Sequence, residues 1–401
     1  MVSPSAELSM HFVNSANGLI AIITCTEHRI FVQWESVPIE KVNASKIKLK
    51  VYIENSGSMN GYMQQKSELK DAVKSYVSAL DLQVDTTELF YINSIITPIS
   101  NVNISSLEDV LNPLSLANGA GNKANSDIAE MLNAVISHTT NNSVSLFVSD
   151  CILDVPQGNA VNYFGVKQTS ITRTFAKALR KNPNLGVEIF RLMSSYNGMY
   201  YYSKGYEPFD GKRPYYMWVI GNKNVLALLN KKVPFSTILH GYENYVAYST
   251  TTKVPFDVST SVKKNKVKGK LNGKGQYEFN FMLDMSETLQ EESILENLQY
   301  YTTRTEKNVS VSNITRVQQG TEYTHVLTLA ISNNTKPCSE TVLFIPVASP
   351  AWIKEMNDDS GSCIKKNENK TTGIKYLIQG VSNAYKDYST LATIDFKIKN
   401  K

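Results

Sequence analysis

Alternating strand and helix patterns over residues 46–232 constrain the fold of this chain more than any other feature. Strict alternation in IKLKVYI (47–53) predicts a strand, and the apolar spacing in SELKDAVKSYVSAL (67–80) predicts an amphipathic helix. SVSLFVSD (143–150) is apolar enough for the centre of a sheet. Repeated strand–helix units of this length predict an α/β domain with a doubly wound, mostly parallel sheet. Further strands are expected at 88–96, 186–194 and 215–221, and further helices at 126–138, 170–181 and 223–232.

The pattern changes after residue 232. At 401 residues the chain is longer than one compact core usually is, so a second domain is expected. Residues 233–401 are expected to form a β-rich domain, for which a β-sandwich is a candidate arrangement, with one helix at 373–387 packed on it. Its strands are predicted from period-two or continuous apolar runs at 276–285, 322–332, 340–347 and 389–398, with a hairpin turn at Asn272-Gly273.

Residues 1–45 form an N-terminal segment that allows two interpretations. The apolar stretch that ends at Cys25 is similar to a bacterial lipoprotein signal, which would place the protein in the cell envelope with a lipid anchor at Cys25. Residues 1–17 contain no Lys or Arg, however, so the positive region of an export signal is missing. The alternative is a β-hairpin formed by LIAIIT (19–24) and RIFVQW (29–34).

The four cysteines do not have the spacing of a metal site. No CxxC pair occurs, and the five histidines show no HxxxH spacing, which argues against zinc or haem. Cys338 and Cys363 can pair if the compartment is oxidising. Cys151 lies inside an apolar run and is expected to be a small buried hydrophobe.

Oxygen-bearing side chains follow the predicted parallel strands at the points where those strands end. Glu54, Ser56 and Ser58 follow the strand 47–53, and Asp150 ends the strand 143–150. Ser126 precedes a predicted helix and is expected to be its N-cap. Loops at the carboxyl ends of parallel strands converge, so these five side chains are expected to lie together. Such an all-oxygen set predicts a site for Mg²⁺, with Mn²⁺ or Ca²⁺ as alternatives.

The stretches VYIENSGSM and SVSLFVSD resemble the von Willebrand factor A domain over roughly residues 46–232. In that family a metal-ion-dependent adhesion site has the pattern D-x-S-x-S, followed by a Thr and then an Asp. The resemblance matches Ser56 and Ser58 to the two serines, Ser126 to the threonine and Asp150 to the distal aspartate. Glu54 replaces the first aspartate with a side chain that is one methylene longer.

The resemblance implies a binding protein rather than an enzyme. In the family, the metal keeps one position open, and a carboxylate from a protein partner completes the coordination shell. One alternative is a structural or assembly scaffold in which the metal site is degenerate. A serine-dependent enzyme built on the hydroxyl cluster is a remote alternative, because no general base lies near these serines in sequence. Ser67 also opens an S-x-x-K sequence (67–70) with KTTG (370–373) downstream, but the final element of this motif has an inserted residue.

Two further segments have unusual composition. KKNKVKGKLNGKGQ (263–276) contains six lysines, and we interpret it as a solvated hairpin, as exposed charge runs usually are. It has no aromatic residue on which a base could stack, which argues against binding of single-stranded nucleic acid. No nucleic-acid partner is therefore expected. Residues 194–218 contain seven tyrosines in what reads as a connection, which is either a recognition surface or a layer packed on the sheet.

Overall fold

The computed structural model divides the chain into two compact units, each of which is described by itself. One unit comprises Met1–Lys41, Thr251–Val347 and Tyr388–Lys401, and will be called the β unit; the other comprises Val42–Thr250 and Ala348–Asp387, and will be called the α/β unit. The structure describes residues 8–15, 18–25, 30–33, 37, 46–63, 66–100, 102–123, 127–155, 160–202, 205–258, 266–267, 270–304, 308–317, 321–361 and 367–400.

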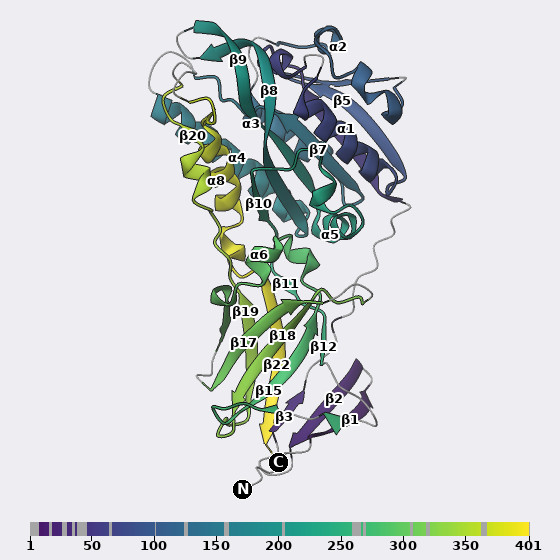
Figure 1. Ribbon diagram of the computed structural model, residues 1–401, viewed down its shortest axis with the longest axis vertical. Helices are drawn as coiled ribbons and strands as arrows, with labels where there is room; N and C mark the ends of the chain where they lie inside the picture. The colour runs from purple at the N-terminus through teal and green to yellow at the C-terminus, as the bar shows by residue number, and fades with distance from the viewer. Residues whose placement is uncertain are drawn as a thin grey trace. The chain divides into compact units, whose positions relative to one another are not determined.

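The α/β unit is built on a seven-stranded mixed sheet with the order β10-β8-β9-β7-β4-β5-β6 (Figure 1). Only β4 with β5 and β4 with β7 pair in parallel, whereas the other four pairings are antiparallel. The prediction of a mostly parallel sheet is therefore wrong, although the α/β class is confirmed. The strands are β4 (Lys48–Glu54), β5 (Thr86–Ile92), β6 (Ile96–Pro98), β7 (Ser143–Ser149), β8 (Leu185–Tyr202), β9 (Gly205–Asn222) and β10 (Asn244–Tyr248).

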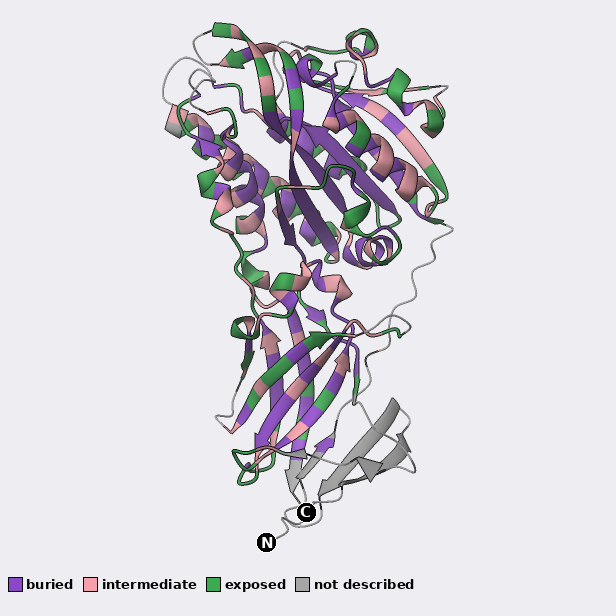
Figure 2. Cartoon of the chain, viewed as in Figure 1, coloured by how far each residue is buried: buried purple, intermediate pink, exposed green. Residues whose placement is uncertain are grey.

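Helices cover both faces of this sheet. In the sheet order, the chain moves through α1 from β4 toward the β6 edge, and through α3 and α4 toward the β10 edge. Because such crossovers are right-handed, α1 lies on one face of the sheet, and α3 and α4 lie on the other (Figure 1). β7 is buried along its whole length, as expected for a strand between two helical layers (Figure 2). The helices are α1 (Glu68–Asp81), α2 (Pro113–Asn118), α3 (Ile128–His138), α4 (Ala160–Lys181) and α5 (Lys223–Lys232).

The tyrosine-rich segment is not a connection but the outer half of a long hairpin. β8 and β9 pair antiparallel from Leu185 with Asn222 to Tyr202 with Gly205. This hairpin inserts β9 between β7 and β8, which is why the sheet is mixed. Glycines interrupt the sequence pattern of β8, and glycines and two prolines interrupt that of β9, so the period-two signal does not predict strands of this length.

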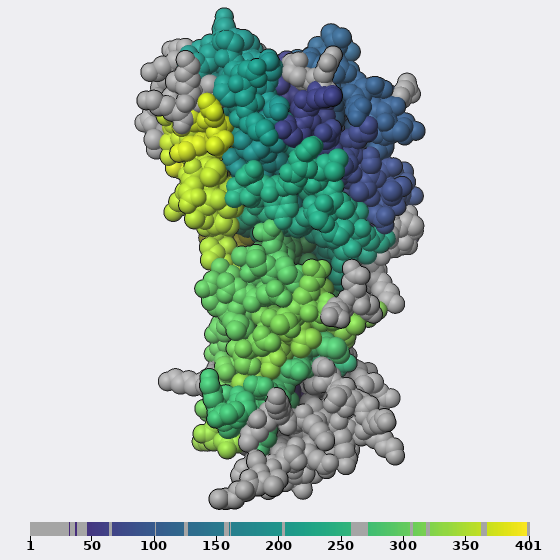
Figure 3. All heavy atoms as spheres, viewed as in Figure 1, coloured from purple at the N-terminus to yellow at the C-terminus, as the bar shows by residue number. Residues whose placement is uncertain are grey.

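The sequence predicts that the C-terminal helix packs on the β-rich domain. In the structure this helix belongs to the α/β unit instead. α8 (Ile374–Ala384) packs on α4: the Thr172 hydroxyl donates to the carbonyl oxygen of Gly380 at 3.0 Å, and the rings of Phe164 and Tyr376 stack with centroids 4.8 Å apart. Figure 3 shows the yellow C-terminal segment against the teal segment that contains β8 and β9. The short elements α7 (Trp352–Glu355), β20 (Asn357–Asp358) and β21 (Thr371–Thr372) precede α8.

The close approach of α8 to α4 gives a first prediction. A Cβ atom added to Gly380 would lie 2.8 Å from the carbonyl oxygen of Gln168 and 2.8 Å from Cβ of Ile171. Gly380→Ala is therefore expected to lower the free energy of unfolding by about 1–3 kcal/mol. Gly165→Ala, on α4 with nothing within 4 Å of the added Cβ, is the matched control and should raise it by about 0.5–1 kcal/mol. Urea unfolding of both variants checks this, and equal stabilities would contradict the helix contact.

The β unit contains two five-stranded sheets that share one hydrophobic core. Alternate residues of β15, such as Phe279 and Phe281, and of β22, such as Ile394 and Phe396, point into this core. This unit is thus rich in β-strands, whereas the β-sandwich expected for residues 233–401 stays a prediction. The strands are β11 (Thr252–Lys253), β12 (Phe256–Val258), β14 (Lys270–Leu271), β15 (Gln276–Leu283), β16 (Tyr301–Thr303), β17 (Val309–Arg316), β18 (His325–Ser332), β19 (Cys338–Phe344) and β22 (Ala392–Asn400), and α6 spans Glu292–Leu295.

The N-terminal residues form strands. β1 (Leu8–Ser15) pairs antiparallel with β2 (Gly18–Cys25), and β1 also pairs with β13 (Lys266–Val267). Among the described residues, β3 (Ile30–Gln33) pairs with β22 and β2 pairs with β1, so the predicted pairing of β2 with β3 in a hairpin is not found there. Lipidation of Cys25 stays a prediction. In the described part of the chain, no helix is long and apolar enough to cross a membrane.

Candidate functional site

The turn after β4 carries three of the predicted site residues. Glu54 ends the strand, and Ser56 and Ser58 follow it with their hydroxyl oxygens 3.0 Å apart. The turn is held by its neighbours, since the Asn55 N–H donates to the Ile92 carbonyl at 3.1 Å and the Gly57 N–H donates to the Lys123 carbonyl at 3.2 Å. Both serine hydroxyls are therefore fixed at the carboxyl end of the sheet.

The short helix after this turn, η2 (Ser58–Tyr62), lies directly against β8. A Cβ atom on Gly198 would be 2.8 Å from Cα of Gly61, so the two backbones approach as closely as glycine permits. The Tyr62 hydroxyl donates to the carbonyl oxygen of Pro214 at 2.6 Å, and the Tyr62 ring packs edge-on against Tyr196 with centroids 4.8 Å apart. The hairpin thus positions the turn that carries Ser56 and Ser58.

Asp150 follows β7 and is buried. Its Oδ1 accepts a hydrogen bond from the Ile152 N–H at 3.2 Å. Its Oδ2 has no hydrogen bond of ordinary geometry among the described residues, although the Ser58 hydroxyl is close enough to influence its ionisation. Burial raises the pKa of Asp150, opposed by hydrogen bonding from Ser58 and Ile152 and by the positive charge of Arg213. One carboxylate oxygen is thus available beside the two serines.

Glu54 is tied to the neighbouring strand. Its Oε2 accepts a hydrogen bond from the Ser149 hydroxyl at 2.5 Å, and the Ser149 oxygen accepts the N–H of Cys151 at 2.8 Å. Cys151 is buried, as predicted, and has a φ of 53°, a left-handed conformation that is uncommon for this residue type. Such strained positions cluster at functional sites, and here one follows Asp150 directly.

Some predicted features lie outside the described residues, including Ser126, Cys363 and much of the lysine-rich segment 263–276. The N-cap of α3 is Asp127, not Ser126, because the Asp127 carboxylate accepts the N–H groups of Ala129 at 3.1 Å and Glu130 at 3.4 Å. The structure therefore brings together Ser56, Ser58 and Asp150 of the five predicted site residues, whereas the Glu54 carboxylate is hydrogen-bonded to Ser149.

A cavity of about 430 Å³ opens beside these residues. Its walls come from segments far apart in sequence: the turn after β4, the loop after β7, the tip of the β8–β9 hairpin and the C-terminal segment. The hairpin tip brings the Tyr201 ring close to the turn after β4: a Cβ atom added to Gly57 would lie 3.6 Å from this ring. Thr372 and Gly361 line this cavity although no sequence pattern indicates that they do. The lining residues are Ser56, Gly57, Ser58, Lys123, Ile152, Leu153, Asp154, Val155, Tyr201, Tyr202, Gly205, Gly361 and Thr372.

Arg213, on β9, is a further residue that no sequence pattern indicated. Its side chain is 1% exposed, and its guanidinium carbon lies 4.4 Å from the centre of the Tyr200 ring. None of its three nitrogens has a hydrogen bond of ordinary geometry among the described residues. Nothing in the local sequence GKRPYY distinguishes this arginine from an exposed one.

The oxygen set fits a hard divalent cation. The buried Oδ2 of Asp150 and the hydroxyls of Ser56 and Ser58 are the ligand types that Mg²⁺, Mn²⁺ and Ca²⁺ accept. No cluster of three or more His, Cys, Asp or Glu side chains suited to a metal occurs among the described residues, so a cation here would depend on hydroxyls and water as well. Ser67, by contrast, accepts the Lys70 N–H as the N-cap of α1 and does not line the cavity.

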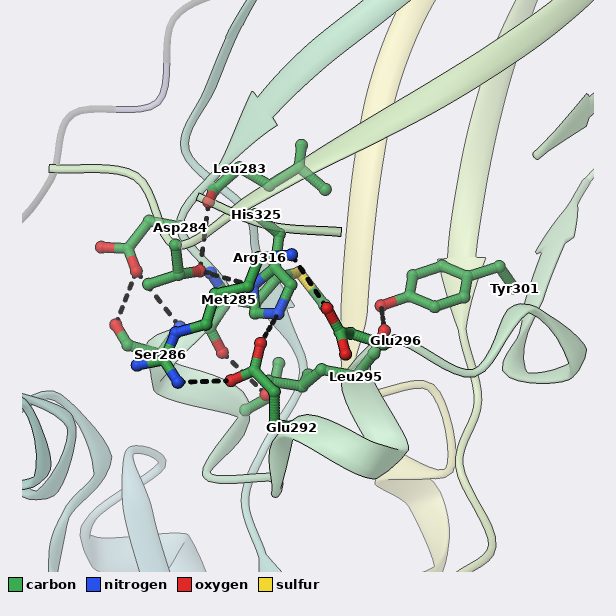
Figure 4. A network of polar contacts seen from close by, with 12 residues as sticks. Leu283, Asp284, Met285, Ser286, Glu292, Leu295, Glu296, Tyr301, Arg316 and His325 are labelled. Carbon is green, nitrogen blue, oxygen red and sulfur yellow. Dashed lines mark hydrogen bonds and ion pairs between the residues drawn. The ribbon is translucent and has the colours of Figure 1, made fainter. Parts of the chain in front are cut away.

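A separate polar cluster lies in the β unit (Figure 4). The buried His325 has its Nε2 2.9 Å from Glu292 Oε1 and its Nδ1 2.9 Å from Thr324 Oγ1. Arg316 Nη1 lies 3.5 Å from Glu292 Oε2, and the Arg316 N–H donates to Glu296 Oε1 at 3.0 Å. Burial lowers the pKa of His325, although the Glu292 carboxylate opposes this shift. The cluster ties α6 to β17 and β18, and we assign it a structural role.

No known family model matches the chain, and no curated protein is similar to it. The α/β unit combines the paired serines, the buried Asp150 and a cavity that the serines line.

Proposed function

We propose that the chain is a non-enzymatic binding protein that engages a protein partner through a divalent cation at the carboxyl ends of β4 and β7. The observation that carries this proposal is the buried Oδ2 of Asp150 near the Ser58 hydroxyl. Ser56 and Ser58, whose hydroxyl oxygens are 3.0 Å apart, line a cavity of about 430 Å³. Mg²⁺ is the cation that we propose, and Mn²⁺ or Ca²⁺ are alternatives.

The fold supports a von Willebrand factor A-like assignment in its first half. The spatial order β6-β5-β4-β7, with helices on both faces, follows the 3-2-1-4 order of one class of doubly wound sheet, although β6 pairs antiparallel with β5. The insertion of β9 departs from that pattern. The likeness is therefore restricted to the half of the sheet that carries Glu54, Ser56, Ser58 and Asp150.

Each residue would have a separate role toward the cation. Asp150 would supply a negatively charged oxygen, and Ser56 and Ser58 would supply neutral oxygens. Glu54, which accepts a hydrogen bond from Ser149, would orient a water molecule bound to the cation. When bound, the cation supplies an electrophilic centre for a carboxylate oxygen of the partner. A site with few anionic protein ligands keeps that centre reactive toward such a carboxylate.

Cation-dependent stabilisation tests this function. Mn²⁺ or Mg²⁺ at about 100 times its dissociation constant should raise the free energy of unfolding by about 2.7 kcal/mol, because it binds only the folded chain. Asp150→Ala and Ser56→Ala should each abolish this gain, measured as a melting-temperature shift. Ser137→Ala removes an exposed hydroxyl on α3 and is the matched control. No shift of wild-type protein at millimolar Mn²⁺ would refute the cation site.

A second candidate function is a metal-independent scaffold that binds through the tip of the β8–β9 hairpin. The side chains of Tyr201 and Tyr206 are 47% and 67% exposed, and their rings lie 6.3 Å apart. Exposed tyrosines give a large contact area at a low cost in conformational entropy. Partner capture that persists in EDTA would favour this candidate over the cation-dependent one.

A further inference from the structure

The cavity that Ser56 and Ser58 line is larger than a cation and one carboxylate require. Its volume is about 430 Å³, whereas a cavity of about 150 Å³ already holds a benzene ring. Pockets of about 300–1,000 Å³ commonly hold small ligands and are lined mostly by apolar groups with a few polar ones. The cavity therefore has room for an apolar group of the partner beside the carboxylate that binds the cation.

The loop after β7 supplies an apolar wall. Ile152, Leu153 and Val155 line the cavity, and Leu153 and Val155 are buried. The Leu153 N–H donates to the Thr372 carbonyl at 3.1 Å, which fixes this loop against the C-terminal segment of the same unit. The Leu153 side chain is closely packed, because a Cβ atom added to Gly373 would lie 2.6 Å from its Cδ1. The apolar wall is therefore held in place before any ligand binds.

The tip of the β8–β9 hairpin supplies an aromatic wall. Tyr201 and Tyr202 line the cavity, and a Cβ atom added to Gly57 would lie 3.6 Å from both the ring and the hydroxyl of Tyr201. Tyr201 is 47% exposed, so part of its ring is free to contact a ligand. Aromatic rings pair favourably with other aromatic rings at centroid distances of about 4.5–7 Å. An aromatic wall beside an apolar one thus favours an aromatic group in the cavity.

The charges around the cavity favour a ligand with a single anionic group. Among the described residues that line it, Lys123 and Asp154 carry opposite charges. The Lys123 ammonium group also donates a hydrogen bond to the Ala117 carbonyl. A divalent cation beside Ser56 and Ser58 would therefore leave the cavity positive mainly at its serine end. One carboxylate complements that end, and the rest of the ligand is best uncharged.

We propose that this cavity selects partners in which an aromatic side chain lies next to the acidic residue that binds the cation. The carboxylate reaches the cation at Ser56, Ser58 and Asp150, while the aromatic ring enters the cavity between Tyr201 and the apolar wall. This inference rests on the proposed cation-dependent function and adds to it the kind of peptide segment that is recognised. Tyr201 is then a specificity-determining residue that has no part in binding the cation.

Tetrapeptides that are acetylated and amidated at their ends test this selection on the full chain. In millimolar Mn²⁺, Gly-Asp-Phe-Gly should bind at least about tenfold more tightly than Gly-Asp-Ala-Gly, because the Phe side chain becomes buried. Gly-Asn-Phe-Gly, in which an amide replaces the carboxylate, should bind equally in Mn²⁺ and in EDTA. Isothermal titration calorimetry measures each affinity.

Variants of the hairpin tip locate the contact. Tyr201→Ala should reduce the preference for Phe over Ala by about three- to tenfold, because an aromatic pair is lost, and should leave the Mn²⁺ affinity unchanged. Tyr201→Phe keeps the ring and should keep the preference. Tyr206→Ala removes a tyrosine that is 67% exposed and does not line the cavity, so the preference should change by less than about twofold. Equal losses from Tyr201→Ala and Tyr206→Ala would place the contact on the exposed tip and refute the cavity as its site.

The outcomes separate this inference from the proposed function. If Mn²⁺ tightens the binding of both Asp peptides and Phe gives no advantage, the selection by the cavity is refuted and the proposed function stands. If Phe is preferred but Mn²⁺ affects neither peptide, the selection is supported and the cation-dependent function is refuted. If neither peptide binds in Mn²⁺ or in EDTA, the selection is refuted, and the stabilisation of the wild type by Mn²⁺ decides the proposed function.

Discussion

Glu188→Gln is expected to stabilise the folded chain by about 3 kcal/mol above pH 7 and to have almost no effect at pH 4.5. Glu188 lies on β8 and is fully buried. Its Oε1 accepts hydrogen bonds from Asn230 Nδ2 at 2.7 Å and from the Tyr245 hydroxyl at 2.9 Å. Its Oε2 has no hydrogen-bond partner among the described residues, so the ionised form is poorly compensated.

The sign of this effect follows from the two pKa values. Burial raises the pKa of Glu188 to about 7, against 4.5 for the ordinary side chain, although the bonds from Asn230 and Tyr245 oppose the shift. Between these values the unfolded chain loses its proton and the folded chain keeps it, so stability falls as the pH rises. Above pH 7 both states are ionised, and the loss of about 1.4 kcal/mol per pKa unit is complete.

Urea unfolding at several pH values measures the difference between variant and wild type. The difference should grow from pH 4.5 to about 7 and then level off. Glu355→Gln removes an exposed carboxylate of the same unit and is the control, with a curve expected to parallel that of the wild type. A constant difference between Glu188→Gln and wild type across this range would contradict the raised pKa.

The elements with strong periodicity could be predicted from the sequence. β4, α1, β7 and α5 were predicted to within about two residues, because their apolar spacing is regular and their ends carry turn or capping residues. The meeting of Ser58 with Asp150 followed from the parallel pairing of β4 with β7, which the register of Ile53 with Val148 confirms.

What could not be predicted depends on contacts between distant segments. α8 packs on α4 through a hydrogen bond between residues 208 positions apart, and no local pattern indicates that partner. The tyrosine-rich strands carry Pro208 and Pro214 at positions where a strand prediction normally stops. Arg213 is buried in this hairpin, where it pairs with Ser194 of β8, and no local pattern indicates that burial.

Gly61→Ala is expected to lower the free energy of unfolding by about 3 kcal/mol and to displace the turn that carries Ser56 and Ser58. The added Cβ would lie 2.3 Å from the Tyr196 ring. That ring cannot move aside easily, because its hydroxyl donates to the Met199 carbonyl at 2.6 Å and its edge packs on Tyr62. Gly198→Ala changes the other residue of this contact, because its added Cβ would lie 2.8 Å from Cα of Gly61.

Gly57→Ala is the control for this prediction, because it changes a residue of the same turn without a clash. The nearest atoms to its added Cβ belong to the Tyr201 ring at 3.6 Å, an ordinary contact, and its φ of −60° suits alanine. We expect its stability to change by less than about 0.5 kcal/mol. Urea unfolding and Mn²⁺ titration of Gly61→Ala, Gly198→Ala and Gly57→Ala together show whether β8 positions the site. If Gly61→Ala and Gly198→Ala were as stable as Gly57→Ala, the hairpin could not be what holds Ser56 and Ser58 beside Asp150.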